Sequence, residues 1–386
     1  MANDKDFKVK NGIKPTVYHE AVGTVTSGSE GYNLSSGSYE TQYVTSTQDT
    51  VPAGVSFKSD GMAFYIIGFN TDTVYQYTLS TAWDVSTASY ASKSFSVATQ
   101  DTLPYKVKFK SDGTKMYMVG ITSNTVYQYT LSTAWDISTA SYDSVSFSVS
   151  TQATSPVGLD FSSDGTSMYV LQFNGSTFQY TLSTSWDLST ASYASKSFTN
   201  SSGVNGEYGL AFKSDGTKMY VVGISSDTVS QYSLSTAWDI STASSDNVSL
   251  SVVSQEDQPR DVTLSSDGTK LYVSGSGSTT GKVVQYSIVT NTATLDLSTG
   301  SVFELTPTSD IQVTLGNPAA SGTVSGATLL LSASGTAYTI TYDPIIQWAG
   351  GTAPTSPAIG DKDVLTFTTR DGGTTYSAAL AIDGAQ

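Results

Sequence analysis

A tripeptide that returns at a fixed spacing constrains this 386-residue chain more than any other feature. Ser-Asp-Gly occurs five times, successive copies lying 52, 52, 51 and 52 residues apart, and Gln-Tyr and Trp-Asp pairs keep step with it. The landmarks start at Ser59, Ser111, Ser163, Ser214 and Ser266, at Gln76, Gln128, Gln179, Gln231 and Gln285, and at Trp83, Trp135, Trp186 and Trp238. A repeat of this length indicates a solenoid, a propeller or an array.

Inside each unit the hydrophobic period is two. In the second copy Val107 and Phe109 alternate with Lys106 and Lys108, and β-branched and aromatic runs are bounded by turn residues. This pattern predicts four short strands per unit, which is the blade of a β-propeller, a fold that protects its sheet edges by radial repetition. We therefore predict an all-β chain with a five-bladed propeller over residues 32–288.

The two ends of the repeat region are complementary. The fifth unit stops after Gln285-Tyr286 without a Trp-Asp pair or a fourth strand, whereas residues 32–39 align with residues 83–90 of the first complete unit. We expect this N-terminal strand to pair with the third strand of the last unit. The ring would then close without a free sheet edge.

The turn between the first two strands carries a family resemblance. Residues 212–222, F-K-S-D-G-T-K-M-Y-V-V, resemble the repeat of lactonase-like and other WD40-related propellers. The Asp is expected to bind its own turn backbone and the Gly to adopt a positive φ, a structural role that we favour over calcium ligation. The repeated Trp is interpreted as a packing anchor.

Composition excludes several classes of function. The chain has 18 Lys and Arg against 33 Asp and Glu, so 18 − 33 gives a net charge of −15, the wrong sign for a nucleic-acid partner. It has no Cys and one His, which excludes thiolate and multi-histidine metal sites. Neither a signal peptide nor a run of about 18 apolar residues is present. We predict no metal, no cofactor, no membrane insertion and no export signal.

Alternation along the first strand of each blade separates two faces. One set is apolar and should pack between blades, and the other is small or polar and should line the central channel. The channel set includes Ser56, Lys106, Lys108, Asp160, Asp261 and Thr263. We favour a polar channel with internal ion pairs over a functional pocket.

Function is expected where the copies disagree. The loops between the second and third strands and the entries to the first strands vary, and in propellers both open onto one face. Their aromatic and amide groups are candidates for stacking on and hydrogen bonding to a glycan or receptor, although exposed aromatics also occur in loops without such a role. The candidate residues are Phe69, Asn70, Tyr105, Asn124, Phe173, Asn174, Tyr208 and Arg260.

After about residue 289 the period stops, and alternating runs predict a second β domain, a sandwich, over residues 289–386. This part resembles a module of bacteriophage tail-fibre and related virion proteins. The likeness rests on Phe303–Thr306, Asn317-Pro318, Trp348–Pro354, Asp363–Phe367 and Thr369–Tyr376, where Tyr376 lacks the preceding Trp of that family. Residues 1–31, which contain the motif Phe7–Gly12, are similar to the leader of phage fibre subunits and would dock on the particle.

No catalytic residue is predicted. The single His19 lies in the leader, so a serine hydrolase is rejected. A glycosidase needs two carboxylates, and residue type alone leaves several open. These are Asp160, Glu207, Glu256, Asp257 and Asp261.

Two functions from different classes follow. The resemblance implies a non-enzymatic bacteriophage virion protein, a tail fibre or decoration protein. It would assemble in the host cytoplasm, form a homo-oligomer with a trimer favoured, and contact other virion proteins or a host-surface polysaccharide or receptor. The alternative is a propeller enzyme, either a glycan depolymerase or a lactonase-like hydrolase.

Overall fold

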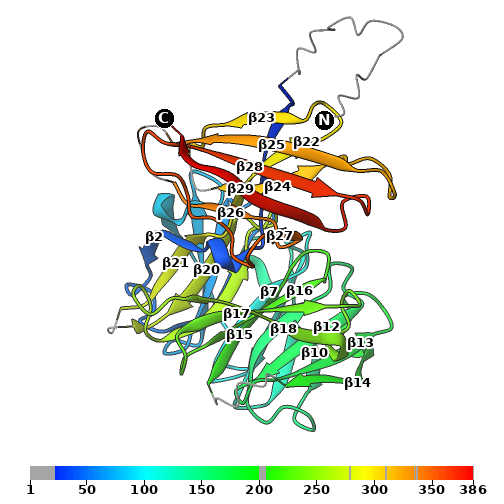
Figure 1. Ribbon diagram of the computed structural model, residues 1–386. Coiled ribbons are helices and arrows are strands. Elements are labelled where there is room, and N and C mark those ends of the chain that lie inside the picture. Colours follow the sequence, from blue (N-terminus) through cyan, green and yellow to red (C-terminus); the bar gives the residue numbers. More distant parts are fainter. Residues whose placement is uncertain are drawn as a thin grey trace, which may run out of the picture. The chain divides into compact units, whose positions relative to one another are not determined.

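The computed structural model describes residues 22–199, 206–277, 280–308, 311–333, 335 and 338–385. Residues 30–289 form one compact unit, and residues 290–386 form a second unit together with the described residues before Glu30. The first unit consists of antiparallel four-stranded sheets (Figure 1). It confirms the predicted five-bladed propeller.

Each blade runs outward from an innermost first strand. Blade 1 contains β3 (Pro52–Phe57), β4 (Ala63–Gly68), β5 (Thr73–Leu79) and β6 (Ala88–Ser96). Blade 2 contains β7 (Pro104–Phe109), β8 (Lys115–Gly120), β9 (Thr125–Leu131) and β10 (Ala140–Ser148). Blade 3 contains β11 (Pro156–Phe161), β12 (Ser167–Gln172), β13 (Ser176–Leu182) and β14 (Ala191–Thr199). Blade 4 contains β15 (Glu207–Phe212), β16 (Lys218–Gly223), β17 (Thr228–Leu234) and β18 (Ala243–Ser251).

Blade 5 is assembled from both ends of the repeat region. It contains β19 (Pro259–Leu264), β20 (Lys270–Gly275) and β21 (Lys282–Ser287), and its outer strand is the N-terminal β2 (Ser38–Val44), which pairs antiparallel with β21. The innermost strands contact one another in the order β3, β7, β11, β15, β19 and back to β3. The predicted closure of the ring is therefore confirmed.

The repeated turn folds as its residue types dictate. In blade 2 the Asp112 carboxylate accepts the backbone N–H of Thr114 at 3.0 Å, and Gly113 has a φ of 73°. A Cβ on Gly113 would lie 2.4 Å from the Trp135 ring. The glycine therefore supplies both the left-handed backbone and the surface on which the repeated Trp packs.

Two rings of hydrogen bonds join neighbouring blades. In the first, a tyrosine of each second strand donates its hydroxyl to the backbone carbonyl of the Trp in the next blade. The donors and acceptors are Tyr65 to Trp135 (2.7 Å), Tyr117 to Trp186 (2.5 Å), Tyr169 to Trp238 (2.6 Å), Tyr220 to Tyr32 (2.8 Å) and Tyr272 to Trp83 (2.7 Å). Tyr32 thus takes the place of the missing fifth Trp.

The second ring uses the glutamine of each Gln-Tyr pair. Its side-chain oxygen accepts a backbone N–H at the start of a short 3-10 helix in the adjacent blade. These helices are η1 (Leu34–Ser36), η2 (Val85–Thr87), η3 (Ile137–Thr139), η4 (Leu188–Thr190) and η5 (Ile240–Thr242). The pairs are Gln76 with Ile137, Gln128 with Leu188, Gln179 with Ile240, Gln231 with Leu34 and Gln285 with Val85. The Trp-Asp and Gln-Tyr pairs therefore recur because each blade needs the same hydrogen bonds to its neighbour for the ring to close.

The second unit is a two-sheet β domain, as predicted. One sheet has the order β1 (Val25–Glu30), β22 (Thr290–Asp296), β24 (Ile311–Gly316) and β26 (Ile340–Tyr342). The other has the order β23 (Val302–Leu305), β25 (Ser325–Ser332), β28 (Lys362–Thr369), β29 (Tyr376–Ala385) and β27 (Ile346–Trp348). Its core includes Phe303, Leu329, Leu365 and Phe367, all at most 1% exposed.

The N-terminal segment differs from the expected leader. Residues 1–31 are predicted to form a docking segment, but Val25–Glu30 form strand β1 in a sheet of the second unit. The motif Phe7–Gly12 and His19 lie outside the described residues.

Candidate functional site

The axis of the propeller is filled by a buried ion pair. The first channel-facing residue after the bulge in each inner strand is Gly54, Lys106, Gly158, Gly209 or Asp261. The Lys106 ammonium pairs with the Asp261 carboxylate, and both residues are at most 2% exposed. Three glycines thus leave the room that two long charged side chains occupy.

The strand between the two charges helps to hold them. The Lys106 ammonium donates to the backbone carbonyl of Val55 at 2.8 Å, and Asp261 Oδ2 accepts the Val55 N–H at 2.7 Å. Burial lowers the pKa of Lys106 and raises the pKa of Asp261, while their mutual attraction opposes both shifts. Asp261 Oδ1 has no hydrogen-bond partner, and it lies 2.7 Å from where a Cβ on Gly209 would be.

A second layer along the axis contains Ser56, Lys108, Asp160, Ala211 and Thr263. Lys108 pairs with Asp160 at 2.7 Å, and the Ser56 hydroxyl donates to the Val107 carbonyl at 2.5 Å. Asp160 also accepts the backbone N–H groups of Phe161 and Phe212. Beside this layer is a cavity of about 150 Å³, lined in part by Ser56, Lys108 and Thr263. The polar residues of the channel therefore bind mainly one another.

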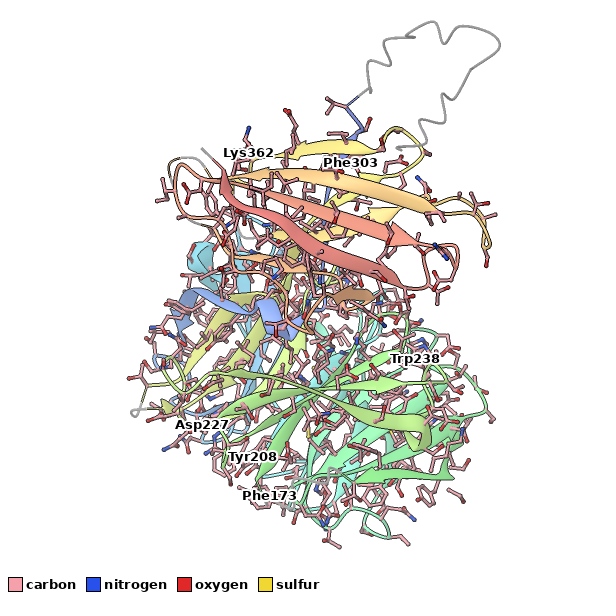
Figure 2. The ribbon with its side chains drawn as sticks, viewed as in Figure 1. Phe173, Tyr208, Asp227, Trp238, Phe303 and Lys362 are labelled. Atoms are coloured by element: carbon pink, nitrogen blue, oxygen red, sulfur yellow. The ribbon has the colours of Figure 1, made fainter. Side chains whose placement is uncertain are left out.

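At the end of the channel where the first strands begin, five side chains meet, one from each blade. They are Phe69, Tyr105, Phe173, Tyr208 and Arg260, which we call the aromatic mouth. Tyr105 stacks on Tyr208 with ring centroids 5.7 Å apart, and Phe69 and Phe173 pack edge-on against Tyr105 and Tyr208 at 5.6 and 5.1 Å. Figure 2 shows Phe173 beside Tyr208, with Trp238 at the other end of the blades.

Arg260 completes the aromatic mouth. Its guanidinium carbon lies 5.3 Å from the ring centroid of Tyr208 and 5.7 Å from that of Phe69, within cation–π range. Its Nε donates to the Ser276 hydroxyl at 3.3 Å. The pKa of Tyr105 is raised to about 12. Burial is the main cause, the neighbouring Tyr208 adds to the rise, and Arg260 opposes it. The Tyr105 hydroxyl is therefore protonated at neutral pH and can donate a hydrogen bond.

The three asparagines among the candidates serve their own loops. Asn70 donates to the Thr50 hydroxyl at 2.9 Å, and the Asn174 side chain accepts the Ser176 N–H at 3.0 Å. With its amide assigned so that the nitrogen faces the acceptors, Asn124 donates to the carbonyls of Ile121 and Thr154. Their amides are thus engaged in loop structure, whereas the four aromatic residues and Arg260 come together.

Three acidic residues hold the loops of the aromatic mouth, and of these only Glu256 is among the candidates predicted from the sequence, as a glycosidase carboxylate. Asp49 accepts the N–H groups of Val51, Asn70 and Thr71, and Asp101 accepts those of Leu103, Thr122 and Ser123. Glu256 does the same for Gln258 and Gly277. The recurring pairs Gln48-Asp49, Gln100-Asp101 and Gln255-Glu256 were a signal for this role.

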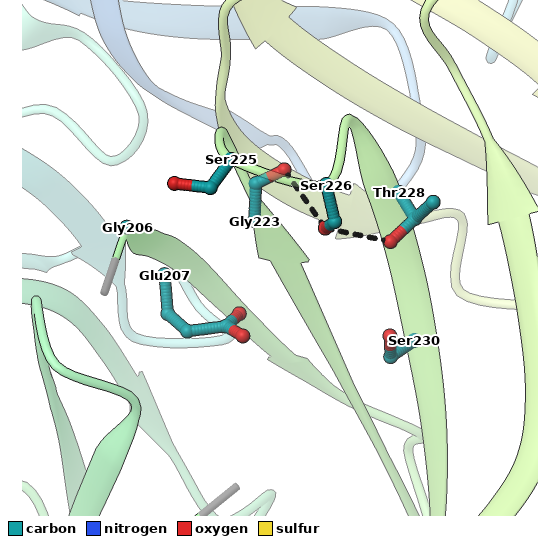
Figure 3. Close-up of a pocket in the computed structure, with 7 residues that line it drawn as sticks. All are labelled: Gly206, Glu207, Gly223, Ser225, Ser226, Thr228 and Ser230. Carbon is teal, nitrogen blue, oxygen red and sulfur yellow. Dashed lines mark hydrogen bonds between the residues drawn. The ribbon is translucent and has the colours of Figure 1, made fainter. Parts of the chain in front are cut away.

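In blade 4 an acidic residue of the inner strand lies where the linker acids of blades 1 and 2 bind their loops. Glu207 reaches from β15 toward Gly223, at the place where Asp49 meets Gly68 and Asp101 meets Gly120. Its carboxylate lies in a cavity of about 120 Å³ with Ser225, Ser226, Thr228 and Ser230 (Figure 3). Glu207 therefore occupies the position of a loop-binding acid.

No protein-family model and no curated protein matches the chain. Solved structures do match. A candidate 6-phosphogluconolactonase from Bacteroides uniformis is 15% identical over 61% of this chain and 71% of its own, with a TM-score of 0.40. Another from Bacteroides fragilis is 15% identical over 60% and 66%, with a TM-score of 0.38. A luciferin-regenerating enzyme is 12% identical over 64% and 95%, with a TM-score of 0.40.

These names correct the functional expectation. The neighbours named here carry enzyme names and none is named as a virion protein, which runs counter to the expected non-enzymatic bacteriophage virion protein. At these identities the likeness itself shows the fold alone. The likeness to lactonase-related propellers is the part of the resemblance that the neighbours share. The expected partners and location stay predictions. Among the described residues no group of three or more His, Cys, Asp or Glu is arranged to hold a metal, and no helix there is long and apolar enough to span a membrane.

Proposed function

We propose that the chain is a lactonase-like hydrolase whose substrate, the lactone of a sugar acid, binds at the aromatic mouth. The observation that supports this proposal is the convergence of four aromatic rings and one guanidinium, one residue from each blade, at one end of the channel. Such rings suit the apolar faces of a sugar ring, and their polar tips suit its oxygens.

Hydrolysis of a lactone can proceed by direct attack of water, without a covalent intermediate on the enzyme. Water adds to the carbonyl carbon and releases one proton to solvent, an oxyanion develops, and the ring ester C–O bond then breaks as its oxygen takes up a proton from solvent. The main requirement is a fixed donor or cation where the negative charge develops. Arg260 supplies a guanidinium with five N–H donors, and the Tyr105 hydroxyl is held protonated beside it. Both are therefore assigned to the oxyanion.

Glycan cleavage fits the arrangement less well. A glycosidase uses two carboxylates that flank an open site. Asp261 is paired with Lys106 and Asp160 with Lys108. Glu256 binds two backbone N–H groups, and Glu207 lies against Gly223. These carboxylates are engaged in the structure of the propeller, so the depolymerase alternative is not taken further.

The test is hydrolysis of aldono-δ-lactones followed by acid release at pH 6.5, with the spontaneous rate subtracted. We expect Arg260→Met to lower kcat by about 10²–10³, the usual effect of removing an oxyanion donor. Arg370→Met, at the other arginine of the chain, is the matched control and should keep the wild-type rate. A wild-type rate equal to the spontaneous one, or an Arg260→Met variant as active as wild type, would contradict the proposal.

A further inference from the structure

Three loops near the aromatic mouth place a short polar side chain at the same position. Asp72, Asn124 and Asp227 lie between the second and third strands of blades 1, 2 and 4, and each has a φ of 49°. Their backbone carbonyls accept the N–H groups of Val97, Val149 and Val252 in the linkers to the next blades. The three residues are therefore structurally equivalent, so the two aspartates can be compared directly with the asparagine.

The asparagine shows what this position requires. The Asn124 amide is assigned the orientation in which its nitrogen, and not its oxygen, faces two carbonyl oxygens. In that orientation it donates to Ile121, three residues earlier, at 3.0 Å and to Thr154, 30 residues later, at 2.9 Å. The second bond joins the loop to the linker before β11. At the same offsets from Asp72 are Phe69 and Thr102, and at the same offsets from Asp227 are Ile224 and Asp257. From the equivalence of the three loops we expect the side chains of Asp72 and Asp227 to face the corresponding two carbonyl oxygens, where a hydrogen-bond donor is required.

An ionised aspartate cannot supply that donor. Asp72 Oδ1 and Asp227 Oδ1 are both buried without a hydrogen-bond partner. Carboxylates add to the mismatch: Asp101 and Asp49 face Asp72 from the linkers on either side, and Asp257 faces Asp227. Burial is the first cause that raises the pKa of each, and these like charges raise it further. A protonated carboxyl, in contrast, would donate as the Asn124 amide does.

We infer that Asp72 and Asp227 are acid-operated clasps, which bind the linker carbonyls of Thr102 and Asp257 when protonated and release them when ionised. These linkers lead directly into the aromatic mouth, because Tyr105 follows Thr102 by three residues and Arg260 follows Asp257 by three. Acid therefore fixes the entries of β7 and β19, and base loosens them. The consequence for catalysis rests on the proposed function, but the clasp itself does not.

The sign of the pH dependence follows from linkage. A carboxyl whose pKa is higher in the folded state binds its proton more tightly there, so folding stability falls as pH rises from about 4, the unfolded value, through the folded value. Below pH 4 the two states are protonated alike and the penalty is absent. Replacement by Asn, which donates at every pH, should remove the penalty.

The test compares thermal midpoints at pH 4 and pH 8 for four proteins: wild type, the double variant Asp72→Asn/Asp227→Asn, the reciprocal Asn124→Asp, and Asp383→Asn. The last removes the same charge from an exposed site in the other unit. We expect the double variant to unfold about 2–4 °C higher per site than wild type at pH 8 and equally at pH 4. Asn124→Asp should lose a similar amount at pH 8 alone, and Asp383→Asn should follow wild type.

Hydrogen exchange locates the effect without any activity assay. Peptides covering residues 97–105 and 252–260 should exchange faster at pH 8 in wild type than in the double variant, after correction for the intrinsic rate. A difference between these proteins that does not change with pH would overturn the clasp. So would a rise in the wild-type midpoint on adding 5 mM CaCl₂, on the order used for weak sites, that the double variant lacks, because the carboxylates would then hold a cation.

Discussion

The two ends of the blades follow opposite rules. At the end with the Ser-Asp-Gly turns every blade uses the same parts, a Trp or Tyr32 packed on a glycine and a tyrosine that donates to the next blade. At the aromatic mouth each blade contributes a different residue, and only the combination of Phe69, Tyr105, Phe173, Tyr208 and Arg260 makes the cluster.

This difference separates stability from function within one repeat. Ring closure needs the same contact five times, so the landmarks recur. A site on the axis needs different groups from different blades, so its residues cannot recur. The axis itself is intermediate, because its layer of three glycines, Lys106 and Asp261 is asymmetric yet fully buried. Variants at the two ends should therefore have separable effects.

Deletion of residues 1–45 should have the largest effect. It removes β2 and Tyr32, so β21 is left with an unpaired edge and Tyr220 without its acceptor. An exposed strand edge favours aggregation. We expect an aggregated product with no cooperative unfolding transition. Deletion of residues 1–31 is the control, because it removes β1 of the second unit but keeps Tyr32 and β2. A soluble, cooperatively folded 1–45 deletion would show that closure is dispensable.

The second-largest effect is expected from Lys106→Met. It leaves the Asp261 charge buried and unpaired, a change that typically costs about 3–5 kcal/mol of unfolding free energy. Urea unfolding at pH 7 measures it. The double variant Lys106→Met/Asp261→Asn removes both charges and should recover part of the loss. If the single and double variants are equally unstable, packing rather than charge holds the axis.

Tyr272→Phe and Tyr105→Phe test the two ends with the same chemical change. Tyr272 donates to the Trp83 carbonyl, so its loss should cost about 1 kcal/mol of stability and leave lactone hydrolysis unchanged. Tyr105→Phe should cost a similar free energy of unfolding, about 1 kcal/mol, because Tyr105 is buried, and should in addition lower kcat. If Tyr272→Phe and Tyr105→Phe had equal effects on kcat as well as on stability, the two ends of the blades would not have separate roles.

Much of the propeller could be predicted from the sequence because its contacts repeat at fixed offsets. The five blades, the closing strand and the equivalence of Tyr32 with Trp83 follow from spacing alone. The shared face of Tyr105, Tyr208 and Arg260 follows as well, but their stacking depends on ring closure and rotamers. The loop role of Asn124 depends on a carbonyl 30 residues away. In the second unit β22 pairs parallel with β24 and β27 with β29, and alternation does not encode which strands pair.

The smallest effect is expected at the repeated turn itself. Burial raises the pKa of Asp112, but hydrogen bonds from Lys110 and Thr114 outweigh it and lower the value to about 2. A lowered folded-state pKa stabilises above the unfolded value of about 3.9, and the contribution is lost as pH falls through about 2. Asp112→Asn should therefore cost no more than about 0.5 kcal/mol at pH 7, since the side chain is half exposed, and nothing at pH 2. Because four other blades carry the same turn, a larger loss would mean that the Asp112 turn contributes more than a solvent-screened surface contact.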